Sequence, residues 1–77
     1  MDIDLADVTI HIDEDLDEAG KIKLEESFRQ RDGVISVHIN PLHPHLVAIE
    51  YNPKMIGSRD LVDIPRFQGL RGELVGL

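Results

Sequence analysis

Histidines and carboxylates in two short connecting segments are the side chains of this 77-residue sequence that could hold a metal ion. The candidate ligands are Asp13, Glu14 and Asp15 in the first segment and His43 and His45 in the second. Oxygen and imidazole ligands suit zinc, nickel, copper(II) or iron, whereas copper(I) prefers thiolates. The pattern fits a divalent transition metal as cofactor, but helix capping by the acidic residues and an ordinary surface turn around the histidines explain it as well.

The other two histidines, His11 and His38, alternate with apolar residues, as Glu50 does in a later segment. This alternation places the three polar side chains on the open face of a sheet, where a protein partner could bind. We expect His38 to pair with Ala48 across a hairpin, and Ser36 with Glu50. A solvated antiparallel sheet has the same appearance, so an interaction surface is one of two interpretations.

Support for catalysis is weak. The serines Ser27, Ser36 and Ser58 lie in no nucleophile elbow, and the sequence has no glycine-rich phosphate loop. The paired carboxylates lie on exposed segments at helix starts, with no pocket to perturb them. We therefore expect that the protein is not an enzyme.

Composition limits the cofactors and partners. The absence of cysteine excludes disulfide bonds and thiolate metal sites. A net charge of −7 disfavours nucleic acid and anionic lipid, and favours basic proteins or cations as partners. No apolar run is long enough to span a membrane, and the acidic N-terminus does not resemble a secretory signal. We expect a cytoplasmic protein, monomeric or weakly dimeric, that binds a protein partner.

Two helices are expected from capping residues and apolar spacing. In the first, Asp15 with Glu18 three residues later is typical of a capped start, and Gly33 would end it in a left-handed conformation. Ser58 would cap the second helix, which Pro65 should kink or shorten, leaving the carbonyl of Leu61 without its helical donor. The buried stripe of this second helix is expected to be Leu61, Ile64 and Phe67.

Alternating apolar residues predict three strands, and residues 70–77 supply a fourth, weaker one. The residues expected to face the core are Val8, Ile10 and Ile12, then Ile35, Val37 and Ile39, and then Val47, Ile49 and Tyr51. The resulting order βαββαβ predicts a ferredoxin-like α+β sandwich, with four antiparallel strands in the order 4-1-3-2 and both helices on one face. One domain would span residues 1–77, with residues 1–6 partly frayed. In this topology the two candidate metal-binding segments lie at the same end of the sandwich.

Several segments match the pattern of a known family: Gly33-Val34, Val37, Ile39, residues 47–53, Leu61, Ile64, Gly69 and residues 73–75. The most specific part is Tyr51-Asn52-Pro53, which ends the third strand. Together these segments resemble the heavy-metal-associated domain of copper chaperones, mercury-binding proteins and metal-pumping ATPases, whose strand often ends in Tyr-Asp-Pro. ACT domains, which sense small ligands, share the topology, but this strand ending favours the heavy-metal-associated lineage.

The resemblance implies a position for the family's metal site. Counting back from Gly33, the C-x-x-C pair of that family would fall at Asp17 and Gly20, and neither residue is cysteine. The resemblance therefore implies a non-enzymatic, metallochaperone-like binding module that has lost the cysteine metal site, with an interaction or regulatory role linked to metal handling. The alternative is binding or delivery of a divalent metal through histidine and carboxylate ligands.

Overall fold

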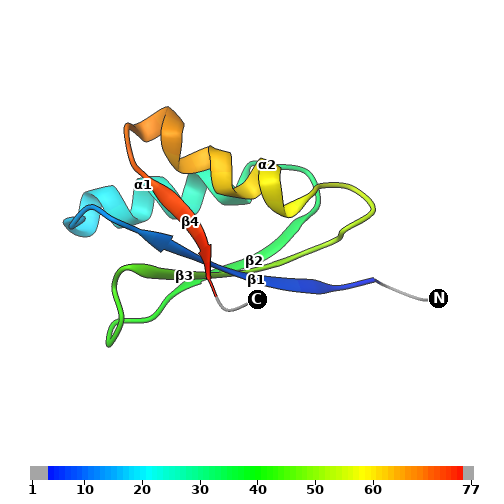
Figure 1. Cartoon of the computed structure of the whole chain (residues 1–77), viewed down its shortest axis with the longest axis horizontal. Coiled ribbons are helices and arrows are strands. Elements are labelled where there is room, and N and C mark those ends of the chain that lie inside the picture. Colours follow the sequence, from blue (N-terminus) through cyan, green and yellow to red (C-terminus); the bar gives the residue numbers. More distant parts are fainter. Residues whose placement is uncertain (1–3, 76–77) are drawn as a thin grey trace.

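A computed structural model of the chain describes residues 4–75. Its elements follow in the order β1 (Ala6–Ile12), α1 (Glu18–Arg29), β2 (Val34–Ile39), β3 (Leu46–Tyr51), α2 (Ser58–Asp63), a 3-10 helix η1 (Ile64–Gln68) and β4 (Gly72–Val75). The strands form one antiparallel sheet in the order β2-β3-β1-β4, and the helices cover one face of it (Figure 1). This is the predicted ferredoxin-like α+β arrangement.

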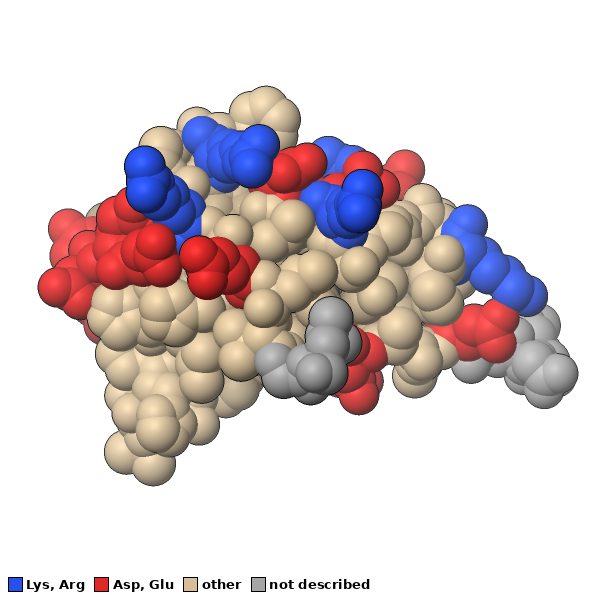
Figure 2. Space-filling model, viewed as in Figure 1, with Lys and Arg blue, Asp and Glu red and all other residues tan. Residues whose placement is uncertain are grey.

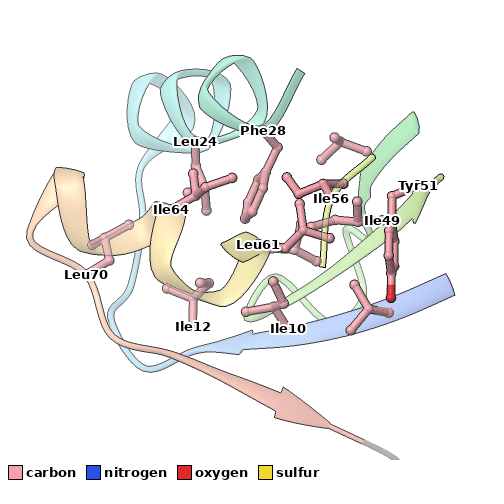
Figure 3. Packing of buried hydrophobic residues seen from close by; sticks show 13 residues of the cluster. Ile10, Ile12, Leu24, Phe28, Ile49, Tyr51, Ile56, Leu61, Ile64 and Leu70 are labelled. Atoms are coloured by element: carbon pink, nitrogen blue, oxygen red, sulfur yellow. The ribbon is translucent and has the colours of Figure 1, made fainter. Parts of the chain in front are cut away.

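The hydrophobic core lies between the sheet and the helices. The inward-facing residues of β1 and β3 are those that the alternation predicted: Val8, Ile10, Ile12, Val47, Ile49 and Tyr51. From the helical layer, Leu24 and Phe28 of α1 and Leu61 of α2 meet them, each completely buried (Figure 3). The core thus lies on one face of the sheet, and the polar residues of the same strands lie on the other.

The start of β2 departs from the predicted alternation. The hairpin register with β3 pairs Val34 with Tyr51, Ser36 with Glu50 and His38 with Ala48. A β-bulge therefore lies between Val34 and Ser36, and the extra residue, Ile35, turns outward. Ile35 is 52% exposed, so the expectation that it faces the core is wrong. The two residue pairs predicted for this hairpin, Ser36 with Glu50 and His38 with Ala48, are confirmed.

Pro65 interrupts the second helix, as predicted. The α-helix ends at Asp63 and the chain continues as the 3-10 helix η1. The carbonyl of Leu61 is nevertheless paired, because it accepts a hydrogen bond from the backbone N–H of Ile64. The expectation that this carbonyl lacks a donor is therefore wrong, and the tighter 3-10 turn is the reason.

Phe67 lies on the 3-10 turn that follows Pro65, and it does not continue the buried stripe. Pro65 and Gln68, one such turn apart, are directed inward: Pro65 is fully buried, and the Gln68 amide donates to the carbonyl of Gly20 at 3.2 Å. Phe67 is 88% exposed, so its expected place in the buried stripe is wrong. Gly69 ends η1 with φ 76°, in the left-handed conformation.

The chain ends are described only in part. β1 already begins at Ala6, inside the segment that we expected to fray, and residues 1–3 lie outside the described range. β4 covers the middle of the predicted fourth strand, whose residues 76–77 also lie outside that range. Within residues 4–75, no helix has the length and apolar character needed to cross a membrane.

Candidate functional site

α1 begins at a hydrogen bond between two residues that the family resemblance singles out. Asp17 has an extended backbone (φ −77°, ψ 178°), and its Oδ1 accepts from the backbone N–H of Gly20 at 2.7 Å. An aspartate in this position stabilises a helix by pairing an N–H of the first turn. The prediction that Asp15 is the cap is wrong, because the chain remains non-helical through Leu16. The two positions that would carry cysteines in the family therefore cap the helix here.

Asp15 contacts the β2–β3 connection instead. Its Oδ1 lies 2.9 Å from Nε2 of His45, and Nδ1 of the same imidazole lies 2.7 Å from the backbone carbonyl of Ile12. Both ring nitrogens thus face oxygen atoms that can only accept hydrogen bonds. The imidazole is therefore held by the backbone of β1 at one nitrogen and by the β1–α1 connection at the other.

His11 belongs to the same cluster. Its Nδ1 lies 3.2 Å from Oδ1 of Asp13, and its ring stacks on that of His45 with 5.7 Å between centroids. The sequence analysis assigned His11 to the open sheet face and did not connect it with His45. The signal that links them is the β1–β3 register, which pairs His11 with Leu46, the residue after His45.

Glu14 ties this end of the molecule to the segment before β4. Its Oε1 accepts from the backbone N–H of Arg71 at 2.8 Å, and the backbone N–H of Asp13 donates to the carbonyl of Arg71 at 3.0 Å. Acidic side chains gather at this end, on the left of the molecule (Figure 2). The β1–α1 connection is therefore both strongly acidic and closely hydrogen-bonded.

The structure does not bring the five candidate metal ligands together at one point. It brings His45 to Asp15 and places Asp13 beside His11, whereas Glu14 contacts Arg71 and His43 is exposed on its turn. Within residues 4–75, no three histidine or carboxylate side chains form a group that could hold a metal ion. The histidine–carboxylate contacts of this end are therefore two separate pairs.

The open face of the sheet carries the interaction candidates His38 and Glu50. A shallow depression of about 130 Å³ is lined there by Asp7, Val8, Thr9, Ser36, His38, Ala48, Ile49 and Glu50. The Ser36 hydroxyl donates to Oε1 of Glu50 at 2.8 Å across the β2–β3 pair. Glu73 lies opposite His11 in the β1–β4 register, so carboxylates occur on three of the four strands of this face.

Comparison with known proteins gives matches at the level of structure. No protein-family model and no curated protein sequence matches the chain.

Three solved structures show the similarity. The first is the N-terminal domain of a potential copper-translocating P-type ATPase from Bacillus subtilis in the Cu(I)-loaded state, 25% identical, with a TM-score of 0.80 over 91% of this chain and 86% of that chain. The second is oxidized MerP from Ralstonia metallidurans, 12% identical, with a TM-score of 0.84 over 95% and 100% of the two chains. The third is the CopZ metallochaperone, 18% identical, with a TM-score of 0.80 over 88% and 100%. The chain has the fold of the heavy-metal-associated domains of metallochaperones and copper-translocating ATPases, and it has no cysteine.

Proposed function

We propose that this protein is a non-enzymatic binding module that takes part in metal handling through a protein partner and carries no copper(I) on thiolates. The observation that supports this most strongly is the Asp17–Gly20 hydrogen bond, which occupies the two cysteine positions of the family with a helix cap. The fold of the copper-binding domains is retained while the chemistry of their site is replaced. We place the module in the cytoplasm, as a monomer or weak dimer.

The open sheet face is the proposed site of the partner. His11, His38 and Glu50 are on this face, and none of the three belongs to the buried core. The chain carries a net charge of −7, and the carboxylates of this face belong to three strands. A basic surface on a metal-handling protein is the partner that this charge favours.

A copper(I) competition titration tests the first half of the proposal. We expect the protein to compete no better than a cysteine-free control, because thiolates are the ligands that select copper(I). The double variant Asp17→Cys, Gly20→Cys is the matched positive control, since it restores the pair at the family's positions. One tight equivalent of copper(I) on the natural sequence would contradict the proposal.

An NMR titration tests the second half. The labelled protein is mixed with a copper-binding ATPase domain from the same organism, and backbone shifts are mapped onto the two faces. We expect shifts confined to the open face and weakened by Glu50→Lys, while Glu26→Lys on the exposed side of α1 leaves the affinity unchanged. A role for this face would be contradicted if no shifts appeared at a millimolar concentration of the partner. It would also be contradicted if Glu50→Lys and Glu26→Lys weakened the binding equally.

A second candidate function is binding of a divalent metal at the acidic end. The observation that favours it is the anchoring of His45, whose Nδ1 is held by a backbone carbonyl while Nε2 faces a carboxylate. Metal-binding histidines commonly have their second nitrogen fixed in this way. Asp13, Glu14 and His43 would have to move to complete a site, so the proposal depends on rearrangement of both connections.

Titration with zinc and with nickel at neutral pH tests this candidate. We expect saturable shifts in both connections, absent from the double variant His43→Ala, His45→Ala and weaker below about pH 6, where histidine is protonated. Weak shifts that grow in proportion to metal concentration would show only counterions around an acidic protein.

A further inference from the structure

Phe67 is 88% exposed, more than the other phenylalanine and the tyrosine, and its backbone belongs to the 3-10 helix η1. It lies on η1 between the fully buried Pro65 and Gly69, and the neighbouring Gln68 amide donates to the carbonyl of Gly20 in α1. A side chain presented on a fixed backbone loses little conformational entropy when it binds a partner. The aromatic ring is therefore displayed on the surface rather than left on a loose loop.

Phe67 also forms one side of a groove between α1 and η1. The groove has a volume of about 240 Å³ and is lined by Ser27, Gln30, Arg31, Ile64 and Phe67. The η1 side is apolar and the α1 side is polar, with Arg31 as the single charged residue of the lining. The space beside the ring is thus large enough for one bulky side chain and has a positive charge at its rim.

The guanidinium of Arg31 is not neutralised by the described part of the protein. Within residues 4–75, no carboxylate lies within ion-pair distance of Arg31, whereas Arg29 pairs with Glu25 at 3.1 Å and Arg66 with Asp63 at 3.6 Å. Lys and Arg side chains lie along the upper, helical side of the molecule, with some acidic side chains between them (Figure 2). Charge complementarity at this groove therefore favours a carboxylate, in contrast with the open sheet face.

We infer that the α1–η1 groove is a second binding surface, which takes an acidic segment of a partner protein. One bulky apolar side chain of the segment packs against Phe67 in the groove, and a neighbouring carboxylate pairs with Arg31. Arginine and aromatic residues are the types most often found at the energetic centres of interfaces, and a guanidinium binds a carboxylate through two parallel hydrogen bonds. The inference rests on the proposed protein-binding role, but it concerns the opposite layer of the sandwich.

Selection from a random peptide library displayed on phage, with the full chain as bait, tests the composition of the occupant. We expect the enriched peptides to share an aromatic or large aliphatic residue next to aspartate or glutamate. Binding of the corresponding synthetic peptides should weaken as salt is raised, because the charge pair lies at the surface. Enrichment of neutral or basic peptides, or no enrichment over an unrelated bait, would overturn the inference.

Two variants and two matched controls locate the site. Phe67→Ala and Arg31→Glu should each reduce the affinity of the selected peptides about tenfold or more, as central interface residues do. Ile22→Ala, an exposed apolar residue of α1, and Arg59→Glu on α2 should leave the affinity unchanged. All four side chains are exposed, and the dispersion of backbone NMR signals checks that each variant is folded.

Equal peptide binding by all four variants would overturn the inference. Sedimentation that shows a dimer of the protein abolished by Phe67→Ala would also overturn it, since a second copy would then occupy the groove. Failure here is distinct from failure of the proposed function, because the open-face titration depends on Glu50 and not on Phe67.

Discussion

The two ends of α1 are held in place by different kinds of contact. At its start, the chain is fixed by contacts of exposed polar side chains, such as Asp17 with Gly20 and Asp15 with His45. Beyond its end, Gly33 has φ 98°, and its carbonyl accepts from the backbone N–H of Asn52 at 2.7 Å. A Cβ atom added to Gly33 would lie only 2.8 Å from Cβ of Met55. Steric contact therefore constrains one end, and polar contact the other.

This difference explains which parts of the family pattern this chain shares. The matching residues Gly33-Val34 and Tyr51-Asn52-Pro53 lie at the sterically constrained end, where a changed residue would disturb the core. The positions where the resemblance places the family's cysteines, Asp17 and Gly20, lie at the polar end, where they begin the helix. The fold of the heavy-metal-associated domains is thus present in a chain without cysteine.

The largest expected effect is that of Gly33→Ala. The variant must adopt φ near 98° and force its methyl group against Met55 and Ile56, which together should cost about 2–4 kcal/mol of unfolding free energy. Gly69→Ala is the matched control, because φ is also positive there but no atom lies within 4 Å of the added Cβ. The control should lose about 1 kcal/mol. Urea unfolding measures both, and equal losses would contradict the steric interpretation.

Pro65→Ala tests packing at a third segment. From the sequence we expect a longer helix and, where tertiary constraints permit, a gain in stability. Pro65 is, however, fully buried and lies close to Gly72 of β4, so the structure supplies such a constraint. Loss of two buried ring carbons and of the proline constraint on the unfolded chain should cost about 2 kcal/mol.

The control for this variant is Pro44→Ala, in the exposed β2–β3 turn. It changes the unfolded chain in the same way but removes no buried atoms, so its expected loss is under about 1 kcal/mol. A rise in the urea midpoint of Pro65→Ala would show that helix extension outweighs the packing.

The sequence predicted the sheet well, because alternation of apolar residues is set by the geometry of each strand. Val47, Ile49 and Tyr51 are all buried as expected. It failed at Ile35, where a β-bulge shifts the alternation by one residue, and at Phe67, where Pro65 and Gln68 take the inward side of η1. Neither irregularity has a strong local signal, since both result from how the chain closes around the core.

The candidate site was predictable only in part. Strand direction correctly placed His45 near Asp15, but it could not show that Nδ1 of this histidine is held by the carbonyl of Ile12. The stacking of His11 on His45 depends on the pairing of β1 with β3, which are separated by a helix and a strand. Predicting contacts of this kind requires the pairing register of β1 with β3, and the order of elements along the chain does not supply it.

Asp17→Ala addresses the polar end directly. Removing the carboxylate leaves the backbone N–H of Gly20 without its partner and should cost about 1 kcal/mol of unfolding free energy. Asp17→Asn keeps an oxygen acceptor, so its unfolding free energy should fall by only a few tenths of a kcal/mol. Thermal unfolding compares the two variants, and a loss in Asp17→Ala as large as that in Gly33→Ala would remove the distinction between the two ends of α1.

The smallest expected effect is that of Asp15→Ala. Its side chain is 96% exposed, so the contact with His45 is surrounded by water and should contribute less than about 1 kcal/mol. His45→Ala should cost more, because it also removes the hydrogen bond to Ile12 and the stacking on His11. A double-mutant cycle of Asp15→Ala and His45→Ala separates the pair from these other contacts. A coupling energy well above about 1 kcal/mol would mean that this contact contributes more than an exposed polar pair normally does, and that polar contacts fix the start of α1 more strongly than the comparison with Gly33 supposes.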